Sequence, residues 1–317
     1  MGAKEAVVLL NMGGPNNLEE VEVFLKNMFN DKNILTMKST LLRKFVGGMI
    51  TFMRTESSQE IYKELGGKSP LVGHTKNLVA KLQERLGEEV YVDFAMRYTP
   101  PFADKVISRL EEKQIEKIYL IPLYPQYSTT TTKSSLEDFE QHYHNTQGNA
   151  VLVEIKHFFE NETYNRTILE KIKECVDGDD YRDFDLIFSA HGLPKKIVQN
   201  GDVYEKHINR HVLLLREMME QENINFHEVH LAYQSKVGPM EWLSPSLEDK
   251  LKTVRNRGVV VFPLAFTIDN SETDYELDVE YREIAEELGF KEYRVAKCPN
   301  DSDGFVDTLE ELYHKMR

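Results

Sequence analysis

The chain enters its first expected strand at Val7-Val8-Leu9-Leu10 and leaves it through the turn Asn11-Met12-Gly13-Gly14-Pro15. The same plan, an apolar run that breaks into a turn or a proline, returns in three further segments: 186–194, 118–125 and 259–266. Residues 7–15 match 186–194, and residues 118–125 match 259–266, which indicates an internal duplication. We therefore expect two similar lobes with a cleft between them.

Expected strands alternate with expected helices in both halves of the chain, in the order strand, helix, strand: 90–96, 104–112 and 118–123, then 229–233, about 246–254 and 259–264. This alternation predicts an α/β fold whose parallel sheets are covered by helices on both faces. The polar stretch 144–148 predicts a linker, which places the lobes at 1–148 and 149–317. A capped helix is expected from Ser302 onward, but its pattern does not say on which lobe it packs.

The composition of the chain disfavours several classes of function. The 317 residues carry a net charge of −14, and 41% of them are hydrophobic, which is typical of a soluble globular protein and disfavours nucleic acid as a partner. No apolar run is long enough to span a bilayer, and the N-terminus leaves no room for a signal peptide before the first strand. The two cysteines, Cys175 and Cys298, lie far apart, which predicts a cytoplasmic, reducing location and no four-cysteine iron–sulfur cluster.

One stretch departs from the acidic composition. Residues 26–54 contain six Lys and Arg side chains and one acid, Asp31, interleaved with methionine, phenylalanine and aliphatic residues. Such a segment suits a flat hydrophobic ligand with acidic edges, or an anionic membrane surface. It also fits two amphipathic helices that pack on the body with their lysines in water. Composition alone slightly favours the second interpretation.

In open parallel sheets, ligands bind beyond the carboxyl ends of the strands. The polar groups that follow the expected strands are therefore candidate ligand contacts: Asn11, Arg97, Tyr98, 124–128, Ser189, His191, 234–236 and 267–269. No GxGxxG or GxxxxGK[ST] motif follows any of these strands, which disfavours dinucleotides and nucleoside triphosphates as ligands.

His191 directly follows an apolar run and precedes a Gly-Leu-Pro turn. An imidazole held there can act as a general base or as a metal ligand; the alternative is a ring that only hydrogen-bonds its own turn. Other histidine pairs are less informative. His207 and His211 lie four residues apart on an expected surface helix, and His227 and His230 flank the start of a strand. Neither pair is predicted to bind a metal.

An acidic row follows the last apolar segment. Ser271 is expected to cap a helix that ends near Gly289, and Glu272, Glu276 and Glu280 recur along one face of it. Like charges at that spacing destabilise a helix by a few tenths of a kcal/mol per pair, so the row calls for an explanation. One explanation is a solvated helix face. The other is a functional role, as a path of hard oxygen ligands for a divalent cation or as a proton relay. The pattern alone leaves both open.

Seven segments together resemble the ferrochelatase family, which inserts Fe²⁺ into protoporphyrin IX in the last step of heme synthesis. They are Leu10-Asn-Met-Gly-Gly-Pro15, Tyr62-Lys-Glu-Leu-Gly-Gly-Lys-Ser-Pro70, Met96-Arg-Tyr98, Tyr124-Pro-Gln-Tyr-Ser128, Ser189-Ala-His-Gly-Leu-Pro194, Tyr233-Gln-Ser-Lys-Val-Gly-Pro239 with Trp242, and Ala265–Asp269 with Glu272–Asp278. The segments follow the family order from residue 7 to about 288, so the resemblance covers nearly the whole chain.

The resemblance implies two Rossmann-like lobes of the chelatase type around a porphyrin site. It implies that His191 and Glu272 are catalytic, and that His191, Glu272, Glu276 and Glu280 contact the metal. It places the porphyrin near six residues: Asn11, Met12, Arg97, Tyr98, Tyr124 and Trp242. Residues 26–54 correspond to the family's pocket lip, which faces the membrane in several members, so a peripheral contact with the inner membrane is expected there.

The chain departs from the family pattern at Asn270, where many members carry a histidine after the residue that here is Asp269. Asparagine can hydrogen-bond a carboxylate but does not titrate near neutrality. A proton role for a second histidine is therefore not implied, and more of the proton chemistry falls on His191 and Glu272.

Fe²⁺ and protoporphyrin IX are the expected substrates, and no tightly bound cofactor is expected. Binding energy that holds the porphyrin bent would turn the pyrrole lone pairs toward the metal. The alternatives are insertion into coproporphyrin III, a sibling class II chelatase for another metal and tetrapyrrole, and a porphyrin or heme carrier with no turnover.

Overall fold

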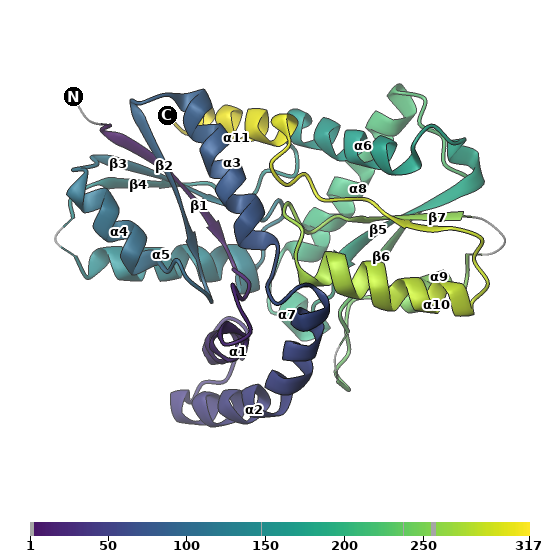
Figure 1. Cartoon of the computed structure of the whole chain (residues 1–317), viewed down its shortest axis with the longest axis horizontal. Coiled ribbons are helices and arrows are strands. Elements are labelled where there is room, and N and C mark those ends of the chain that lie inside the picture. Colours follow the sequence, from purple (N-terminus) through teal and green to yellow (C-terminus); the bar gives the residue numbers. More distant parts are fainter. Residues whose placement is uncertain (1–2, 147, 237, 255–257) are drawn as a thin grey trace. The chain divides into compact units, whose positions relative to one another are not determined.

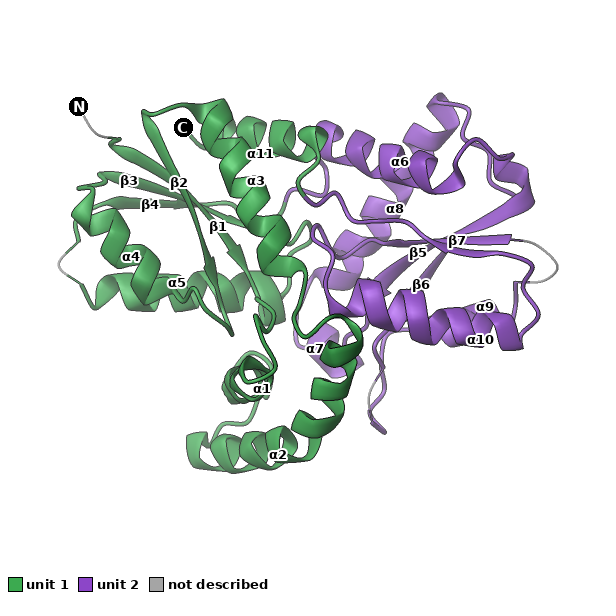
Figure 2. Ribbon diagram, in the orientation of Figure 1, with its two compact units in different colours: residues 1–157, 301–317 green, residues 158–300 purple. Residues whose placement is uncertain are grey.

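The computed structural model describes residues 3–146, 148–236, 238–254 and 258–317. Val237, which belongs to the Tyr233-to-Pro239 motif, lies outside these residues. The chain divides into two compact units (Figure 2): residues 1–157 with 301–317 form unit 1, and residues 158–300 form unit 2. Each unit is built on one sheet of four strands.

The sheet of unit 1 is entirely parallel, in the order β2-β1-β3-β4. Its strands are β1 (Glu5–Asn11), β2 (Val90–Met96), β3 (Lys117–Pro122) and β4 (Val151–Glu154). The apolar side chains of β1 are almost fully buried, and side chains on both of its faces are covered. Near-continuous apolar strands are expected where helices cover both faces of a sheet, so the predicted parallel α/β architecture is confirmed.

Helices lie on both faces of this sheet (Figure 1). The core on one face joins alternate residues of β1 to α4 (Ala103–Glu112) and α5 (Ser134–His144). The other face carries α3 (Leu71–Leu86) and the terminal helix α11 (Asp303–Met316), whose Tyr313 packs edge-on against Tyr119 at a ring separation of 5.0 Å. The remaining helices of the unit are α1 (Glu20–Asn30), α2 (Thr40–Glu64) and the short π-helix η1 (Thr129–Lys133).

The sheet of unit 2 has the same plan, with parallel strands in the order β6-β5-β7-β8. Its strands are β5 (Phe184–His191), β6 (Val229–Gln234), β7 (Gly258–Pro263) and β8 (Tyr293–Val295). Its helices are α6 (Glu162–Val176), η2 (Tyr181–Asp183), α7 (Lys195–Gln199), α8 (Tyr204–Gln221), α9 (Leu247–Leu251), the π-helix η3 (Glu272–Glu280) and α10 (Tyr281–Glu287).

The duplication expected from the sequence is present in the topology. In each unit the first strand lies between the second and the third, and a π-helix follows the third strand. The boundary lies at 157/158 rather than at 148/149, because β4 pairs with β3 and so completes the first sheet. The terminal helix, whose packing the sequence left open, belongs to unit 1.

Candidate active site

The site in unit 2 begins where two neighbouring strands end. His191 is the last residue of β5, and it pairs in register with Gln234, the last residue of β6. The turn after His191 requires a glycine, since a Cβ on Gly192 would lie 2.8 Å from the carbonyl oxygen of Gln234 and 3.3 Å from the ring of Trp242. The predicted position of His191 at a strand end is thus fixed by backbone packing as well as by pairing.

His191 and Glu272 form a hydrogen-bonded pair. The Nδ1 of His191 donates to Oε2 of Glu272 over 2.7 Å, and the two side chains are 38% and 25% exposed. Tyr204 donates to the backbone carbonyl of His191 over 3.0 Å, which further restrains the strand end. Because Nδ1 is engaged by the carboxylate, Nε2 is the ring nitrogen that can exchange a proton with a ligand.

Ser235 joins the first two acids of the row. Its hydroxyl lies 3.0 Å from Oε2 of Glu272 and 2.6 Å from Oε2 of Glu276, and its backbone N–H donates to Glu276 over 2.7 Å. Ser235 adopts a positive φ of 63°, in the left-handed region that is uncommon for residues other than glycine, asparagine and aspartate. This backbone conformation lets both its N–H and its hydroxyl face the acids, so the two carboxylates share one anchor.

The acids and the imidazole shift one another's pKa values. Burial lowers the pKa of His191, but the charge and hydrogen bond of Glu272 outweigh it, so that this pKa is raised. Burial acts to raise the pKa of Glu272, yet His191, Ser235 and Gln234 together lower it. Burial and the neighbouring charge of Glu272 raise the pKa of Glu276 to about 7. The cluster therefore holds a coupled imidazole–carboxylate pair beside a carboxyl group that exchanges protons near neutrality.

Glu280 continues the row toward the surface. It is exposed, and its pKa is raised by partial burial and by Glu283. All three acids lie on η3, a π-helix where the sequence pattern alone indicates an ordinary helix. π-helical turns are rare and are frequent at functional sites. The row thus runs from a half-buried pair to solvent.

The capping hydrogen bond at the start of this helix comes from Asn270 and not from Ser271. The side-chain oxygen of Asn270 accepts a hydrogen bond from the N–H of Glu272 over 2.8 Å, and its amide donates to the carbonyl of Ile268 over 3.1 Å. Ser271 occupies the predicted N-cap position, but its side chain makes no cap hydrogen bond. The predicted stop at Gly289 is confirmed by its φ of +79°. Since Asn270 is 7% exposed and bound to backbone on both sides, it positions Glu272 rather than facing a ligand.

In unit 1, the predicted porphyrin residues lie at the carboxyl ends of β1, β2 and β3. Asn11 ends β1, and its carbonyl accepts from the N–H of Arg97 over 2.8 Å, while the carbonyl of Met12 accepts from Tyr98 over 2.9 Å. Tyr124 follows β3 and its hydroxyl lies 3.1 Å from that of Ser135. The structure therefore brings these five residues to one edge of one sheet.

The side chains of Arg97 and Tyr98 meet at a buried acid. The tyrosine hydroxyl donates to Asp31 over 2.8 Å, and a guanidinium nitrogen of Arg97 lies 3.4 Å from the same carboxylate. Ser134 also donates to Asp31. A second acid, Asp138, lies 3.0 Å from Arg97. Because the Asp31 side chain is 1% exposed, this network fixes Arg97 from the interior side.

Sequence reasoning missed the residues that hold these side chains in place. Asp31 was the one acid in the basic stretch, a signal that was available, whereas Ser134 and Asp138 on α5 gave no comparable sign. Gln234 and Ser235 were recognised as polar groups at a strand end but were not assigned to the site. Trp242, the sixth predicted porphyrin residue, lies in unit 2, half-buried and bridged by backbone to Pro194.

His211 is fully buried and its Nε2 lies 2.7 Å from Oδ1 of Asn165, so the expectation of a surface helix is wrong at that residue. Burial lowers the pKa of His211 to about 3.

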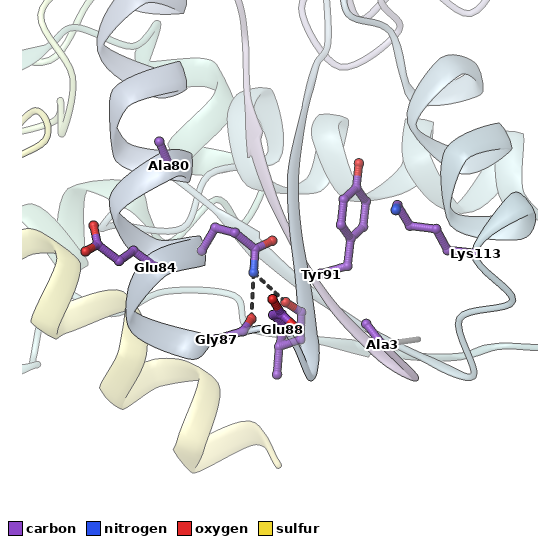
Figure 3. Close-up of a pocket in the computed structure, with 9 residues that line it drawn as sticks. Ala3, Ala80, Glu84, Gly87, Glu88, Tyr91 and Lys113 are labelled. Atoms are coloured by element: carbon purple, nitrogen blue, oxygen red, sulfur yellow. Dashed lines mark hydrogen bonds between the residues drawn. The ribbon is translucent and has the colours of Figure 1, made fainter. Parts of the chain in front are cut away.

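A surface hollow in unit 1 (Figure 3) lies at the amino ends of β1 and β2, beside Ala3, Val90 and Tyr91. It is at the opposite edge of the sheet from the predicted porphyrin residues, none of which lines it.

Known proteins share sequence with almost the whole chain. The family model described as Ferrochelatase matches residues 4–317. The ferrochelatase of Sulfurimonas denitrificans is 68% identical over 99% of this chain and 99% of its own length. The ferrochelatase of Helicobacter pylori strain J99 is 49% identical over 99% of this chain and 94% of its own.

Two solved structures share the fold. SirB from Bacillus subtilis with Fe³⁺ aligns over 99% of this chain and 95% of its own with a TM-score of 0.58 and 11% identity. CbiX, the terminal enzyme of siroheme biosynthesis in denitrifying bacteria, aligns over 99% of both chains with a TM-score of 0.52 and 11% identity. At such identities the likeness concerns the fold, while the family model and the curated relatives carry the assignment. The chain belongs to the ferrochelatase family, whose members are enzymes that insert a metal ion into porphyrin.

Proposed function

We propose that this enzyme inserts Fe²⁺ into protoporphyrin IX and that His191 takes the pyrrole protons. The observation that carries the proposal is the pair of His191 and Glu272, linked through Ser235 to an acid whose pKa is about 7. Insertion of one Fe²⁺ releases two pyrrole protons, so the site needs a base that can be reset twice in each turnover. A raised imidazole pKa makes His191 a stronger base.

The acid row would carry each proton away. A proton accepted at Nε2 of His191 leaves the ring cationic, and the adjacent Glu272 carboxylate stabilises that cation. Glu276 then exchanges the proton at neutral pH, since its own pKa is about 7, and the exposed Glu280 returns it to water. The same carboxylate oxygens are hard ligands that suit an incoming divalent cation. We therefore assign His191 and Glu272 to catalysis, and His191, Glu272, Glu276 and Glu280 to metal contact.

The charge near the predicted porphyrin residues favours protoporphyrin over coproporphyrin. Arg97 is the one cation among the six residues assigned to porphyrin, and it already contacts two acids, Asp31 and Asp138. At these six residues a tetrapyrrole with four carboxylates would meet a single cation, whereas one with two propionates has less charge to compensate. Parallel insertion rates on the two porphyrins test this preference, and faster insertion into coproporphyrin III would reverse it.

Anaerobic incubation with Fe²⁺ and protoporphyrin IX tests the activity. We expect loss of the free-base porphyrin spectrum over many turnovers per chain. His191→Ala should lower kcat by about 10²–10⁴-fold, the range of a general base, with porphyrin binding still measurable. His314→Ala, which alters an exposed histidine far along the chain in α11, is the control. A single stoichiometric spectral change would instead indicate a carrier, and full turnover by His191→Ala would remove that residue from the mechanism.

The first half of α2 presents an apolar face to solvent, in the segment expected to form the pocket lip. Its exposed apolar side chains are 49–85% accessible: Leu41, Leu42, Phe45, Met49, Phe52 and Met53. The helix packs tightly on α1 on its other side, since a Cβ on Gly47 would lie 2.7 Å from the carbonyl oxygen of Phe29. Exposed lysines and an arginine, Lys38, Lys44 and Arg54, flank the apolar face.

We propose that this face meets an anionic bilayer surface. None of the described helices has the length and apolar character of a membrane span. The contact that we propose is peripheral. Co-sedimentation with vesicles of anionic phospholipid should retain the wild-type enzyme, and Phe45→Ser with Phe52→Ser should release it. Binding to neutral vesicles measures the contribution of the apolar side chains without that of the basic ones. If the wild type and the variant sediment equally with anionic vesicles, this face does not bind the bilayer and serves only as the pocket lip. The cytoplasmic location and the lack of a resident cofactor remain predictions.

A further inference from the structure

A second cluster of metal-ligand groups lies at the opposite end of the unit 2 sheet from His191. Asp185 is the second residue of β5 and His230 the second residue of β6, and Glu228 immediately precedes β6. Asp185 and His191 are six residues apart on one strand, which is about 20 Å at the rise of an extended chain. The cluster is therefore separate from the proposed catalytic site.

The two distances from His230 to the acids are those expected of ligands around one ion. The Nε2 of His230 lies 3.4 Å from Oδ2 of Asp185 and 3.4 Å from Oε2 of Glu228, and the three ligand atoms all lie within 4.8 Å of one another. A spacing of 3.4 Å is long for an N–H···O hydrogen bond. It matches the edge of a tetrahedron with metal–ligand bonds of about 2.0–2.2 Å, which is roughly 3.3–3.6 Å.

The buried carboxylate of Asp185 is oriented by groups other than the ligands' side chains. Its Oδ1 accepts from Nδ1 of His227 over 2.8 Å and from the backbone N–H of Glu228 over 3.1 Å. These two bonds hold one oxygen and direct the other, Oδ2, toward His230. A carboxylate or histidine ligand that is fixed by a second hydrogen-bonded group is the usual arrangement around protein-bound metals.

From this geometry, we propose that Asp185, Glu228 and His230 bind a divalent transition-metal ion of the zinc type. One imidazole nitrogen with two carboxylate oxygens suits Zn²⁺, Fe²⁺ or Co²⁺ better than Mg²⁺ or Ca²⁺, which prefer oxygen ligands alone. Asp185 and His230 are 5% and 14% exposed while Glu228 is 61% exposed, so an ion can enter from the Glu228 side. A bound ion would join the starts of β5 and β6. His227 would not contact the ion but would orient the carboxylate of Asp185 through its hydrogen bond.

Co²⁺ is a suitable probe, because tetrahedral Co²⁺ absorbs visible light much more strongly than octahedral Co²⁺. The full chain carrying His191→Ala, Glu272→Gln and Glu276→Gln provides a background that lacks three of the four metal ligands proposed for the catalytic site. We expect this background to bind one Co²⁺ per chain with a tetrahedral spectrum, and Zn²⁺ to displace it. Adding His230→Gln should abolish the site, and His227→Gln should weaken binding about 10–100-fold, as loss of an orienting partner does.

Glu228→Gln tests the site in a variant that should fold normally. The side chain of Glu228 is largely exposed, so its replacement should leave the circular dichroism unchanged. This variant should also lose the tetrahedral spectrum, and Zn²⁺ should no longer raise its melting temperature. His314→Gln, at an exposed histidine beside Glu310, should behave as the background. The proposal is overturned if the background binds no Co²⁺, if the bound Co²⁺ is octahedral, or if His230→Gln and Glu228→Gln retain the site.

Discussion

Met12 and His191 occupy equivalent positions in the two units. The N–H of Leu123 donates to the carbonyl of Leu10 over 2.7 Å, and the N–H of Leu264 donates in the same way to Ser189 over 2.8 Å. Each acceptor thus marks the same point on the first strand of its sheet, and two residues later the chain reaches Met12 in unit 1 and His191 in unit 2. The duplicated fold places a side chain beyond the sheet edge in both units, but one copy carries a base and the other a thioether.

This equivalence predicts a binding role without proton transfer for Met12. A thioether cannot accept a pyrrole proton, but it packs well on a flat apolar ring. Met12→Ala should raise the KM for porphyrin about tenfold, which corresponds to about 1.4 kcal/mol of lost apolar contact, and should leave kcat within a factor of about two. Steady-state rates over a range of porphyrin concentrations separate the two constants. A fall in kcat at unchanged KM would refute this assignment.

The central strands were predicted well because each of them carries its own local pattern. Continuous apolar runs followed by turns marked the central strands, and the repeated plan revealed the duplication. The edge strand β4 was not expected: its four residues are exposed or only half-buried, so they carry little apolar pattern. Its absence from the prediction is the reason that the boundary was placed too early in the chain.

Partners of the site residues were harder to predict than the site residues themselves. Asp31 meets Tyr98 and Ser134 across 67 and 103 residues of chain, and such distant contacts leave no local pattern. The cap at Asn270 was missed because serine is an equally good cap by propensity, and only the fold decides which of the two neighbours faces the helix end. The role of Ser235 depends on its positive φ, which cannot be predicted from a serine in the sequence.

Glu276 should determine the acid side of the pH profile. The reaction needs neutral His191, whose pKa is raised by Glu272 and, in smaller part, by Glu276. Glu276→Gln removes a charge that raises that pKa and also removes a group that titrates at about 7. Both effects act in the same direction, so the acid limb of log kcat/KM against pH should move to lower pH. Glu283→Gln, at an exposed acid of α10, should leave the limb in place; a shift to higher pH for Glu276→Gln would contradict the coupling.

Ser235 should matter through its hydroxyl. The hydroxyl hydrogen-bonds both Glu272 and Glu276 and thereby lowers the pKa of each against burial. Ser235→Ala removes hydrogen bonds to charged groups worth about 1.5–3 kcal/mol, so kcat should fall roughly 10- to 100-fold. The apparent pKa on the acid side should also rise, because an unanchored Glu276 holds its proton to higher pH. Unchanged kcat and pH profile would show that the backbone N–H alone anchors the acids.

Asn270 should be replaceable by aspartate but not by alanine. Asn270→Asp keeps a side-chain oxygen that can accept from the N–H of Glu272, whereas Asn270→Ala leaves that N–H without its cap and should cost about 1 kcal/mol of stability. The start of η3 would then loosen, and kcat should fall with it because Glu272 is held there. Urea unfolding and steady-state rates on both variants provide the measurement. Equal stability of Asn270→Ala and the wild type would show that the cap bond contributes nothing.

Asp31 should be essential for the stability of unit 1 and for the position of Arg97. Its carboxylate is buried against Arg97, Tyr98 and Ser134, and removal of one partner of a buried ion pair costs about 3–5 kcal/mol. We expect the cost of Asp31→Ala to lie near the lower end of that range, because Arg97 is 22% exposed and keeps Asp138.

The matched control for Asp31 is Glu137→Ala, since its carboxylate is 33% exposed and pairs with surface lysines. Surface pairs contribute about 0–1 kcal/mol, so urea unfolding should separate the two variants clearly. Asp31→Asn keeps the shape of the side chain without its charge, and it should raise the KM for porphyrin as Arg97 turns toward Asp138. If Asp31→Asn kept both the wild-type stability and the wild-type KM, the buried charge would have no part in positioning Arg97, and the network would serve packing alone.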